Sequence, residues 1–158
     1  MLIMSHEKTL ILFKPDTIHR GLVGEIINRF ERKGLKIVGL KMMNLNDEIL
    51  AEHYSHHKDK DWFPLLRGFM QKSPIIAIVL EGLSAISIAR NLTGPTKGYD
   101  ALPGTIRGDY SISTRSNIIH ASEDESTAKA EIQRFFNQNE IFDYKRIDFE
   151  VLYAEEER

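Results

Sequence analysis

His120 is the residue of this sequence whose surroundings best suit nucleophilic chemistry. It follows Ile118 and Ile119, an apolar pair that predicts the end of a buried strand. Ser122 stands three residues before Glu125, a spacing that predicts a capping box at the start of a helix. A histidine at such a strand-to-helix junction lies near free backbone N–H groups, which favour phosphate, and it can carry a phosphoryl group transiently. A structural or merely exposed histidine is the alternative, and the local pattern alone favours that alternative.

Cationic side chains elsewhere in the chain are candidates for binding phosphate. The sequence has no G-x-x-x-x-G-K-[ST] loop and no H-R-D or D-F-G motif, so it lacks the phosphate-binding machinery of P-loop enzymes and of protein kinases. The run 94–98 is glycine-rich but is not predicted to open a helix. Phosphate would therefore be held by side chains, and Lys14, Arg90 and Arg107 are the candidates, with the Thr96 hydroxyl beside them.

Two further groups of residues each have competing interpretations. His53 and His56 would lie about one turn apart on a helix, as a metal-binding pair does, but no third ligand is evident. Trp62 belongs to an apolar cluster with Phe63 and Phe69, for which core packing is the ordinary explanation. We adopt that explanation for the two phenylalanines, whereas Trp62 stays open between core packing and a binding site.

Length and composition indicate an ordinary globular protein. The 158 residues suit one domain with a substantial core. The net charge of −2 gives no reason to expect a stable nucleic-acid or membrane partner. Cysteine is absent, which excludes disulfides, thiolate catalysis and Cys-ligated zinc. The first residues do not form a signal peptide, and no apolar stretch approaches the roughly 20 residues of a membrane helix. We therefore expect a cytoplasmic protein.

Apolar patterning predicts four core strands interleaved with helices. The strands are expected near residues 9–13, 35–42, 75–80 and 117–120, and the third is continuous and β-branched, as in a strand buried on both faces. Gly34 predicts the end of the first long helix, and Asn46 the start of the next. Residues 93–115 are predicted to form a long functional loop. This order favours a two-layer sandwich in a single domain, 1–158, with a core of about 9–153, a short N-terminal extension and an acidic C-terminal tail.

Four stretches of the chain together resemble the motifs of the nucleoside diphosphate kinase family. In chain order they are 12–16 (Leu-Phe-Lys-Pro-Asp), 20–24 (Arg-Gly-Leu-Val-Gly), 103–109 (Pro-Gly-Thr-Ile-Arg-Gly-Asp) and 117–122 (Asn-Ile-Ile-His-Ala-Ser), the last followed by an acidic residue. The resemblance covers the chain from about Thr9 to Tyr153, and four ordered motifs make it specific. It implies an α+β fold of the ferredoxin-like kind, a sandwich in which helices cover a four-stranded antiparallel sheet.

The resemblance also implies an activity. A nucleoside diphosphate kinase transfers the γ-phosphate of a nucleoside triphosphate to a nucleoside diphosphate and so maintains nucleoside triphosphate pools. His120 would be phosphorylated in the first of two half-reactions, which gives ping-pong kinetics. Mg²⁺ is expected, bound mainly through the nucleotide phosphates and not by protein ligands. Family members are homo-oligomers, and the long C-terminal segment favours a hexamer over a tetramer.

Site residues are carried over by the same resemblance. Ser122 and Glu131 would orient the histidine, and Tyr54 would lie near it and near the phosphate in transfer. The nucleotide-binding positions are Lys14, Trp62, Leu66, Arg90, Thr96, Arg107 and Asn117, with Trp62 and Leu66 beside the base.

Some positions depart from the family's usual pattern. Trp62 stands where phenylalanine is common, Thr114 where an apolar residue often packs on the base, and Glu123 where aspartate is usual. The loop around Lys97-Gly98 also differs. These departures leave base preference and loop packing between subunits open, although sparse base-edge contacts favour broad base tolerance.

Two other functions are compatible with the same fold. An RNA-binding module would need an R/K-G-F-G-F-V-like run with stacking aromatics on a strand, and the sequence has none. A family member that has lost catalysis and serves as a scaffold would lack part of the site, whereas His120 and the matched phosphate-binding residues are all present.

Overall fold

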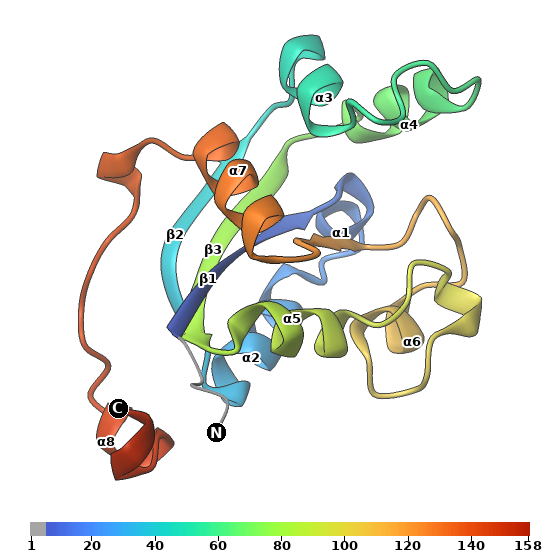
Figure 1. Cartoon of the computed structure of the whole chain (residues 1–158). Helices are drawn as coiled ribbons and strands as arrows, with labels where there is room; N and C mark the ends of the chain where they lie inside the picture. Colours follow the sequence, from blue (N-terminus) through green and yellow to red (C-terminus); the bar gives the residue numbers. More distant parts are fainter. Residues whose placement is uncertain (1–5) are drawn as a thin grey trace.

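A computed structural model of the chain describes residues 6–158 and is built on one four-stranded antiparallel sheet (Figure 1). The strands are β1 (His6–Phe13), β2 (Lys36–Met43), β3 (Ile75–Leu83) and β4 (Ile119–Ala121), in the spatial order β2-β3-β1-β4. The predicted α+β class with its antiparallel sheet is therefore confirmed. Residues 1–5, most of the predicted N-terminal extension, lie outside the described residues.

The two central strands form the most buried part of the molecule. Leu12 of β1 lies opposite Ala77 of β3 on one side and opposite His120 of β4 on the other. Residues 75–80 are buried throughout, as their continuous apolar run predicted. His120 therefore lies on β4 beside β1, where Leu12 is buried in the core.

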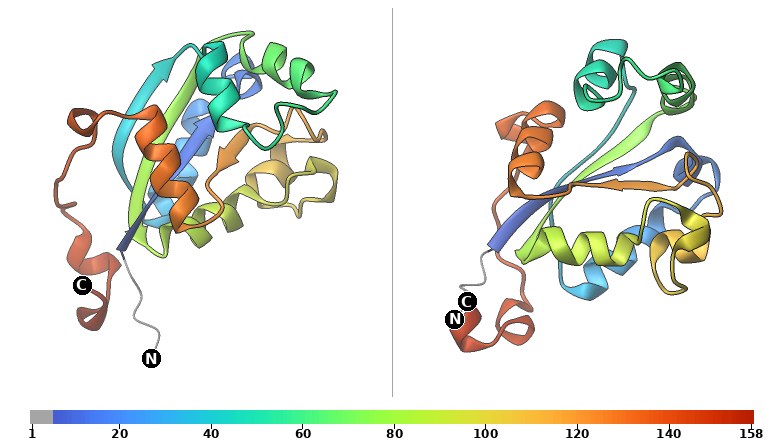
Figure 2. Two further views of the ribbon diagram at one scale, coloured as in Figure 1. Left: turned by 45° about the horizontal axis from the view of Figure 1, so that its top comes forward. Right: turned by 45° about the vertical axis from the view of Figure 1, so that its right-hand side comes forward.

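Helices cover both faces of the sheet (Figure 2). They are α1 (Pro15–His19), α2 (Val23–Lys33), α3 (Asp47–His53), α4 (Phe63–Met70), α5 (Ala85–Thr93), α6 (Ile106–Tyr110), α7 (Glu125–Phe135) and α8 (Phe149–Leu152), with short 3-10 turns at Gly98–Asp100, Gln138–Glu140 and Glu155–Glu157. Because side chains alternate along a strand, Ile11 and Phe13 face the core under α2 and α5. Leu10 and Leu12 face the opposite core, beneath α3, α4 and α7.

Two helix ends follow the signals read from the sequence. α2 ends at Gly34, whose φ of +104° is a left-handed conformation that glycine adopts without a Cβ penalty. α3 starts after Asn46, whose side-chain oxygen accepts a hydrogen bond from the N–H of Ile49 at 2.8 Å. Phe63 is buried and Phe69 packs against the core, as predicted for both.

The predicted start of α7 is wrong. Asp124 caps this helix by accepting a hydrogen bond from the N–H of Thr127 at 2.8 Å, and the helix begins at Glu125. Ser122 takes no part in the cap, because its hydroxyl is buried and bonded elsewhere. His120 consequently lies within β4, away from the N-terminus of the helix.

The remaining connections are less irregular than predicted. The expected loop at 93–115 contains the 3-10 turn Gly98–Asp100 and the helix α6. After α7 the chain returns along β2, where the N–H of Phe142 donates to the carbonyl of Val38 at 2.8 Å. Within the described part of the chain, no helix has the length and apolar character needed to cross a membrane.

Candidate active site

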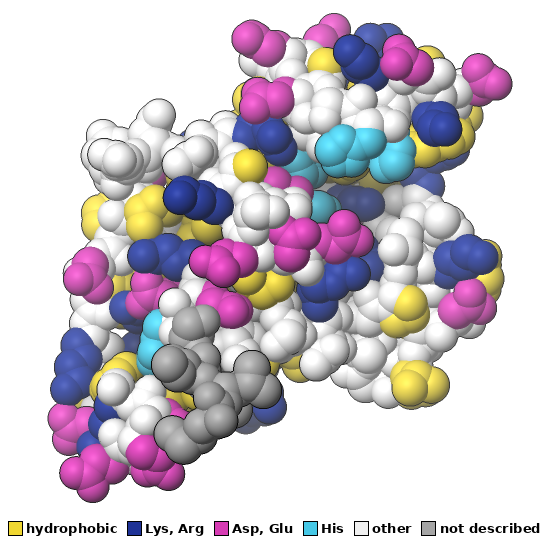
Figure 3. All heavy atoms as spheres, in the orientation of Figure 1, with side chains coloured by type: hydrophobic (Ala, Val, Ile, Leu, Met, Phe, Trp, Pro, Cys, Tyr) yellow, Lys and Arg dark blue, Asp and Glu magenta, His cyan; other side chains and the backbone are white. Residues whose placement is uncertain are grey.

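A cavity of about 450 Å³ opens between the α3–α4 region and the segment that leads into β4. Its lining consists of Lys14, Tyr54, His57, Trp62, Leu66, Thr96, Thr114, Arg115 and Asn117. Figure 3 shows this side of the molecule hollowed, with His, Lys and Arg side chains inside the hollow. A smaller cavity of about 290 Å³ lies by the C-terminal segment and contains none of the predicted site residues.

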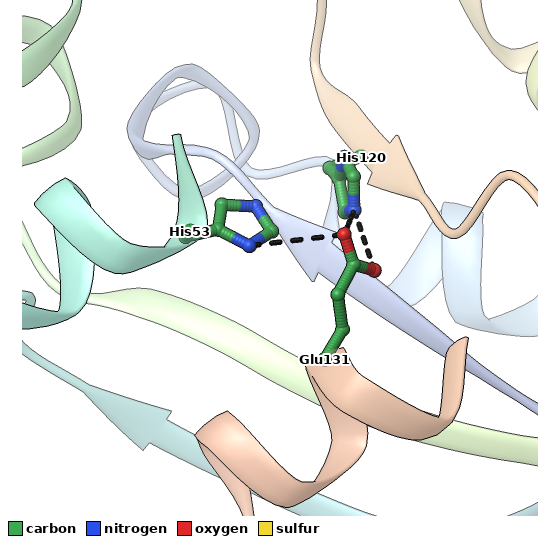
Figure 4. A group of neighbouring side chains, drawn as sticks. All are labelled: His53, His120 and Glu131. Atoms are coloured by element: carbon green, nitrogen blue, oxygen red, sulfur yellow. Dashed lines mark hydrogen bonds and ion pairs between the residues drawn. The ribbon is translucent and has the colours of Figure 1, made fainter. Parts of the chain in front are cut away.

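His120 is oriented beside this cavity by a carboxylate. Its Nε2 lies 3.0 Å and 2.9 Å from the two carboxylate oxygens of Glu131, which comes from α7 (Figure 4). The imidazole is 24% exposed, whereas the Glu131 side chain is only 7% exposed. A neutral imidazole bonded in this way carries its proton on Nε2 and keeps the lone pair of Nδ1 free.

Glu131 is itself held by Ser122. The Ser122 hydroxyl donates to Glu131 Oε2 at 2.6 Å, and it lies 3.3 Å from the N–H of Leu10 on β1. Burial raises the pKa of the Glu131 carboxyl, but the hydrogen bonds from His120 and Ser122 outweigh burial and leave that pKa below its usual range. The carboxylate is therefore charged at neutral pH and fixed by a strand and a helix together.

His53 packs against this pair from the end of α3. Its ring meets that of His120 edge-to-face, with the centroids 4.8 Å apart at 82°. Burial, aided by the neighbouring His120, lowers the pKa of His53 to about 3, so its imidazole is neutral. Nη1 of Arg134 lies 3.2 Å from His53 Nδ1, which makes that nitrogen the acceptor. Nε2 of His53 is buried and has no hydrogen-bond partner among the described residues.

The metal pair that His53 and His56 offered as an alternative does not form. α3 ends at His53, so the two imidazoles do not share a helical face, and His56 is exposed. Within residues 6–158, the group whose donor atoms could surround an ion is His53, His120 and Glu131, with these atoms all within 4.8 Å of one another. The Arg134 guanidinium already occupies Nδ1 of His53, which opposes a cation there.

Lys14 and Asn117 form the buried polar wall of the cavity. Nζ of Lys14 donates to Oδ1 of Asn117 at 2.5 Å, and Nδ2 of Asn117 donates to the carbonyl of Thr96 at 2.9 Å. Burial, together with the positive charge of Arg107, lowers the pKa of Lys14 to about 8. An anion beside this ammonium would relieve the cost of burying it.

Arg107 ties the segments around the site together. Its Nε, Nη1 and Nη2 donate to the carbonyls of Asn117, Gly94 and Ile119 at 3.1 Å, 3.0 Å and 2.5 Å. Burial and the nearby Arg90 lower its pKa to about 10. Arg90 is exposed on α5, and its Nη1 lies 3.4 Å from the carbonyl of Ala121. Arg107 thus has a structural role, in addition to the phosphate binding that the sequence predicted for it.

Ile118 has an unusual backbone conformation between Asn117 and β4. Its φ is +74°, which is strained for a β-branched residue and costs about 1–3 kcal/mol. Three hydrogen bonds hold it. Its N–H donates to Asp16 Oδ2 at 3.0 Å, and its carbonyl accepts from the Lys14 N–H at 2.9 Å and from the Thr17 hydroxyl. The strained residue allows neighbouring Asn117 to face the cavity while β4 continues to His120.

Comparisons with known proteins agree with this geometry. The family model described as nucleoside diphosphate kinase matches residues 7–141. The chain is 51% identical to a nucleoside diphosphate kinase of Parabacteroides distasonis over 96% of this chain and 99% of that protein, and 53% identical to one of Staphylothermus marinus over 89% and 100%. The chain belongs to the nucleoside diphosphate kinase family.

Solved nucleoside diphosphate kinases have the same fold. The enzyme of Halobacterium salinarum in complex with CDP superimposes with a TM-score of 0.92 at 43% identity, covering 95% of this chain and all of that one. A transition-state mimic of the Borrelia burgdorferi enzyme, with bound vanadate and ADP, gives a TM-score of 0.84 at 38% identity, covering 90% and 94%. The ferredoxin-like antiparallel sheet is therefore that of nucleoside diphosphate kinases.

The residues predicted from the family motifs lie around one region. Trp62 is 40% exposed and lines the cavity, which rules out the core explanation for its indole, and Leu66 lines the same cavity at 8% exposure. Tyr54 also lines the cavity. Its hydroxyl is buried without a hydrogen-bond partner in the described structure, and burial raises its pKa. These three residues come from the α3–α4 region, opposite the wall formed by Lys14 and Asn117.

Sequence reasoning missed two residues of the nucleotide-sized cavity. His57 and Arg115 both line it, although neither belongs to one of the family motifs that identified the site. His57 is adjacent to the charged link before Trp62, and Arg115 is adjacent to Thr114, which stands where the family usually has an apolar residue. Their position next to residues assigned to the base was the only signal available.

Proposed function

We propose that this nucleoside diphosphate kinase transfers the γ-phosphate of a nucleoside triphosphate to a nucleoside diphosphate through a phosphohistidine at His120. The observation that carries this proposal is the fixed His120–Glu131–Ser122 chain at the edge of the cavity. A surface histidine without a catalytic role would not need a buried carboxylate that is itself held by a serine. This arrangement supports a nucleophile whose tautomer is fixed in advance.

Nδ1 of His120 is the nucleophile in this mechanism. Nε2–H donates to Glu131, so the lone pair of Nδ1 attacks the γ-phosphorus in line. The N–P bond forms as the bond from phosphorus to the β–γ bridging oxygen breaks, and the nucleoside diphosphate leaves with that electron pair. The negative charge of Glu131 stabilises the positive charge that develops on the ring. In the second half-reaction a terminal phosphate oxygen of another nucleoside diphosphate attacks the same phosphorus and restores the free imidazole.

Side chains on the cavity wall, together with Arg90 and Arg107 from outside its lining, supply the phosphate contacts. Lys14 provides a buried ammonium, and Tyr54 provides a hydroxyl with no partner within residues 6–158. Arg90 is exposed next to β4, and Arg107 has N–H groups left over after its three carbonyl contacts. Thr96 adds a hydroxyl on the cavity wall. Donors of this kind suit the three equatorial oxygens of a phosphoryl group in transfer.

The donor set of the cavity suits phosphate and not a metal ion. Its lining includes the ammonium of Lys14, hydroxyls and an amide, and none of the described lining residues is a carboxylate. We therefore place Mg²⁺ on the nucleotide phosphates, with no protein ligand. When bound there it would neutralise part of the phosphate charge.

The base lies between Trp62 and the opposite wall in this proposal, with Leu66 beneath it. Stacking on an indole requires no base-edge hydrogen bonds, which supports acceptance of several bases. Such an enzyme maintains nucleoside triphosphate pools, and we expect it to do so in the cytoplasm.

A homo-oligomer, with a hexamer favoured over a tetramer, remains part of the proposal. The edge strand β2 exposes Leu40 and Met42, and the segment 99–112 exposes Tyr99, Leu102 and Ile112, which supports burial of these surfaces between subunits. A light-scattering mass of six chains is expected. A mass of two or four chains would contradict the hexamer.

The phosphohistidine is tested by isolating the labelled protein. After incubation with ATP labelled at the γ-phosphate, we expect a label that is acid-labile, base-stable and removed by an added nucleoside diphosphate. His120→Gln should abolish it, whereas His56→Gln, which alters an exposed histidine outside the cavity, should not. Retention of the label in His120→Gln would identify another nucleophile, and its absence from the wild type would leave only a binding module or a scaffold.

A further inference from the structure

Arg115 stands on a turn whose backbone is fixed by serine hydroxyls. Oγ of Ser113 accepts hydrogen bonds from the N–H groups of Arg115 and Ser116, at 3.2 Å and 3.1 Å. Oγ of Ser111 lies 3.1 Å and 3.0 Å from the carbonyl oxygens of Ser113 and Ser116. The turn 111–116 therefore presents the Arg115 side chain from a defined position on the cavity wall.

A second segment supports this turn from behind. The N–H of Gly98 donates to the carbonyl of Ser113 at 3.2 Å. A Cβ at position 98 would lie 2.4 Å from the carbonyl oxygen of Ser111, so only glycine permits this close approach. The Lys97-Gly98 sequence, which differs from the usual family pattern, therefore packs directly against the turn that carries Arg115.

The Arg115 guanidinium is free of partners among residues 6–158. The described residues offer it no side-chain hydrogen bond, ion pair or ring contact, and the residue is exposed. By contrast, Arg107 donates to three carbonyls and Arg29 pairs with Asp109 at 2.7 Å. All five N–H donors of Arg115 are consequently available to a molecule in the cavity.

Trp62 and His57 form an aromatic wall of the same cavity. Their ring centroids lie 5.0 Å apart with the planes tilted by 48°, so His57 supports the indole. A base stacked on Trp62 shares its cavity with Arg115 and Thr114. An aromatic surface together with an unpaired arginine is a combination suited to reading one edge of a stacked base.

We propose that Arg115 reads the edge of the base and gives this enzyme a preference for guanine nucleotides; this inference rests on the proposed function. Arginine can only donate, and its planar fork matches two adjacent acceptors. Guanine presents such a pair at O6 and N7, whereas adenine places an amino donor next to N7 and cytosine presents an amino group at N4. Arginine–guanine pairing is the commonest specific contact between a side chain and a base. The enzyme would then still accept other bases, but it would bind guanine nucleotides more tightly.

Calorimetric dissociation constants for a series of diphosphates test this inference. For the wild type we expect GDP and IDP, which share O6 and N7, to bind roughly tenfold more tightly than ADP, a factor at the low end for one bidentate pair. 7-Deaza-GDP, which lacks N7, should fall toward ADP. Arg115→Gln should remove the advantage of GDP over ADP while leaving thermal stability unchanged, because a glutamine amide suits the N6 and N7 edge of adenine and not the two acceptors of guanine.

Lys97→Gln is the matched control, because it also removes one exposed positive charge near Thr96 but does not line the cavity. It should affect all diphosphates alike. Equal affinities for GDP and ADP in the wild type, or an equal loss for every diphosphate in Arg115→Gln, would overturn the inference. His120 labelling by ATP should persist in Arg115→Gln, so failure of this inference is distinguishable from failure of the proposed function.

Discussion

Lys14→Met should make the nucleotide-free protein's stability less dependent on pH above neutrality. Lys14 is 8% exposed, and its pKa is lowered from 10.5 to about 8 by burial and by Arg107. Folding therefore disfavours the charged form. The cost is fully present below pH 8, declines as the pH rises from 8 to 10.5, and is absent above 10.5.

The size of the effect follows from that change in pKa. A tenfold change in proton affinity is worth about 1.4 kcal/mol, so a fall from 10.5 to about 8 corresponds to about 3 kcal/mol. At pH 9.5 the wild type should have regained about 2 kcal/mol relative to its value at neutral pH. Lys14→Met also removes the hydrogen bond to Asn117, and any dependence of that bond on the protonation of Lys14 is already contained in the lowered pKa.

Urea unfolding of both proteins at pH 7.0, 8.0, 9.0 and 9.5 measures this difference. The free energy of unfolding of the wild type should rise relative to that of the variant as the pH increases. All other titrating groups are common to both proteins and cancel in the comparison. Parallel curves for the two proteins over this range would show that the pKa of Lys14 is not lowered and would refute this reasoning.

Three further predictions concern the other side chains of the site. Arg107→Ala and Arg107→Lys should both lower the melting temperature, because neither replacement has the planar guanidinium whose separate nitrogens reach three backbone carbonyls. Lysine should recover only part of the phosphotransfer. Unchanged melting temperatures would contradict the structural role of Arg107. Trp62 is the only tryptophan, so its emission should change saturably with ADP, and Trp62→Ala should weaken binding by roughly 1–3 kcal/mol while labelling at saturating ATP persists. Flat emission despite binding shown by calorimetry would remove Trp62 from the base site. His53→Phe should lower kcat more than it changes KM, because it removes the hydrogen-bond acceptor for Arg134 beside His120. His53→Gln should recover part of kcat. An equal loss of kcat in both variants would contradict a role of His53 in positioning His120.

Much of the fold could be predicted because local patterns and the global structure agree. The continuous apolar run 75–80 is buried throughout β3, and the helix boundaries at Gly34 and Asn46 follow local signals. The family motifs identified residues that come together from distant parts of the chain, such as Lys14 and Asn117, which are 103 residues apart. No local rule links those positions.

The errors arose where a tertiary contact competes with a local pattern. Ser122 matches a capping box in sequence, but its hydroxyl is used by Glu131, and the carboxylate of Asp124 caps α7 instead. A metal pair of His53 and His56, which the sequence left as an alternative without a third ligand, would have required α3 to continue by another turn, whereas it ends at His53. The strain at Ile118 was invisible in sequence, because a β-branched residue normally gives no reason to expect a positive φ.

The nitrogen that carries the phosphoryl group tests the central claim most directly. Base digestion of the labelled protein, followed by chromatography against the two phosphohistidine isomers, identifies that nitrogen. Because both carboxylate oxygens of Glu131 lie within 3.0 Å of Nε2, the phosphate should be found on Nδ1 of His120. Phosphate on Nε2 would require the hydrogen bond to Glu131 to break and would contradict the role assigned to the His120–Glu131–Ser122 chain.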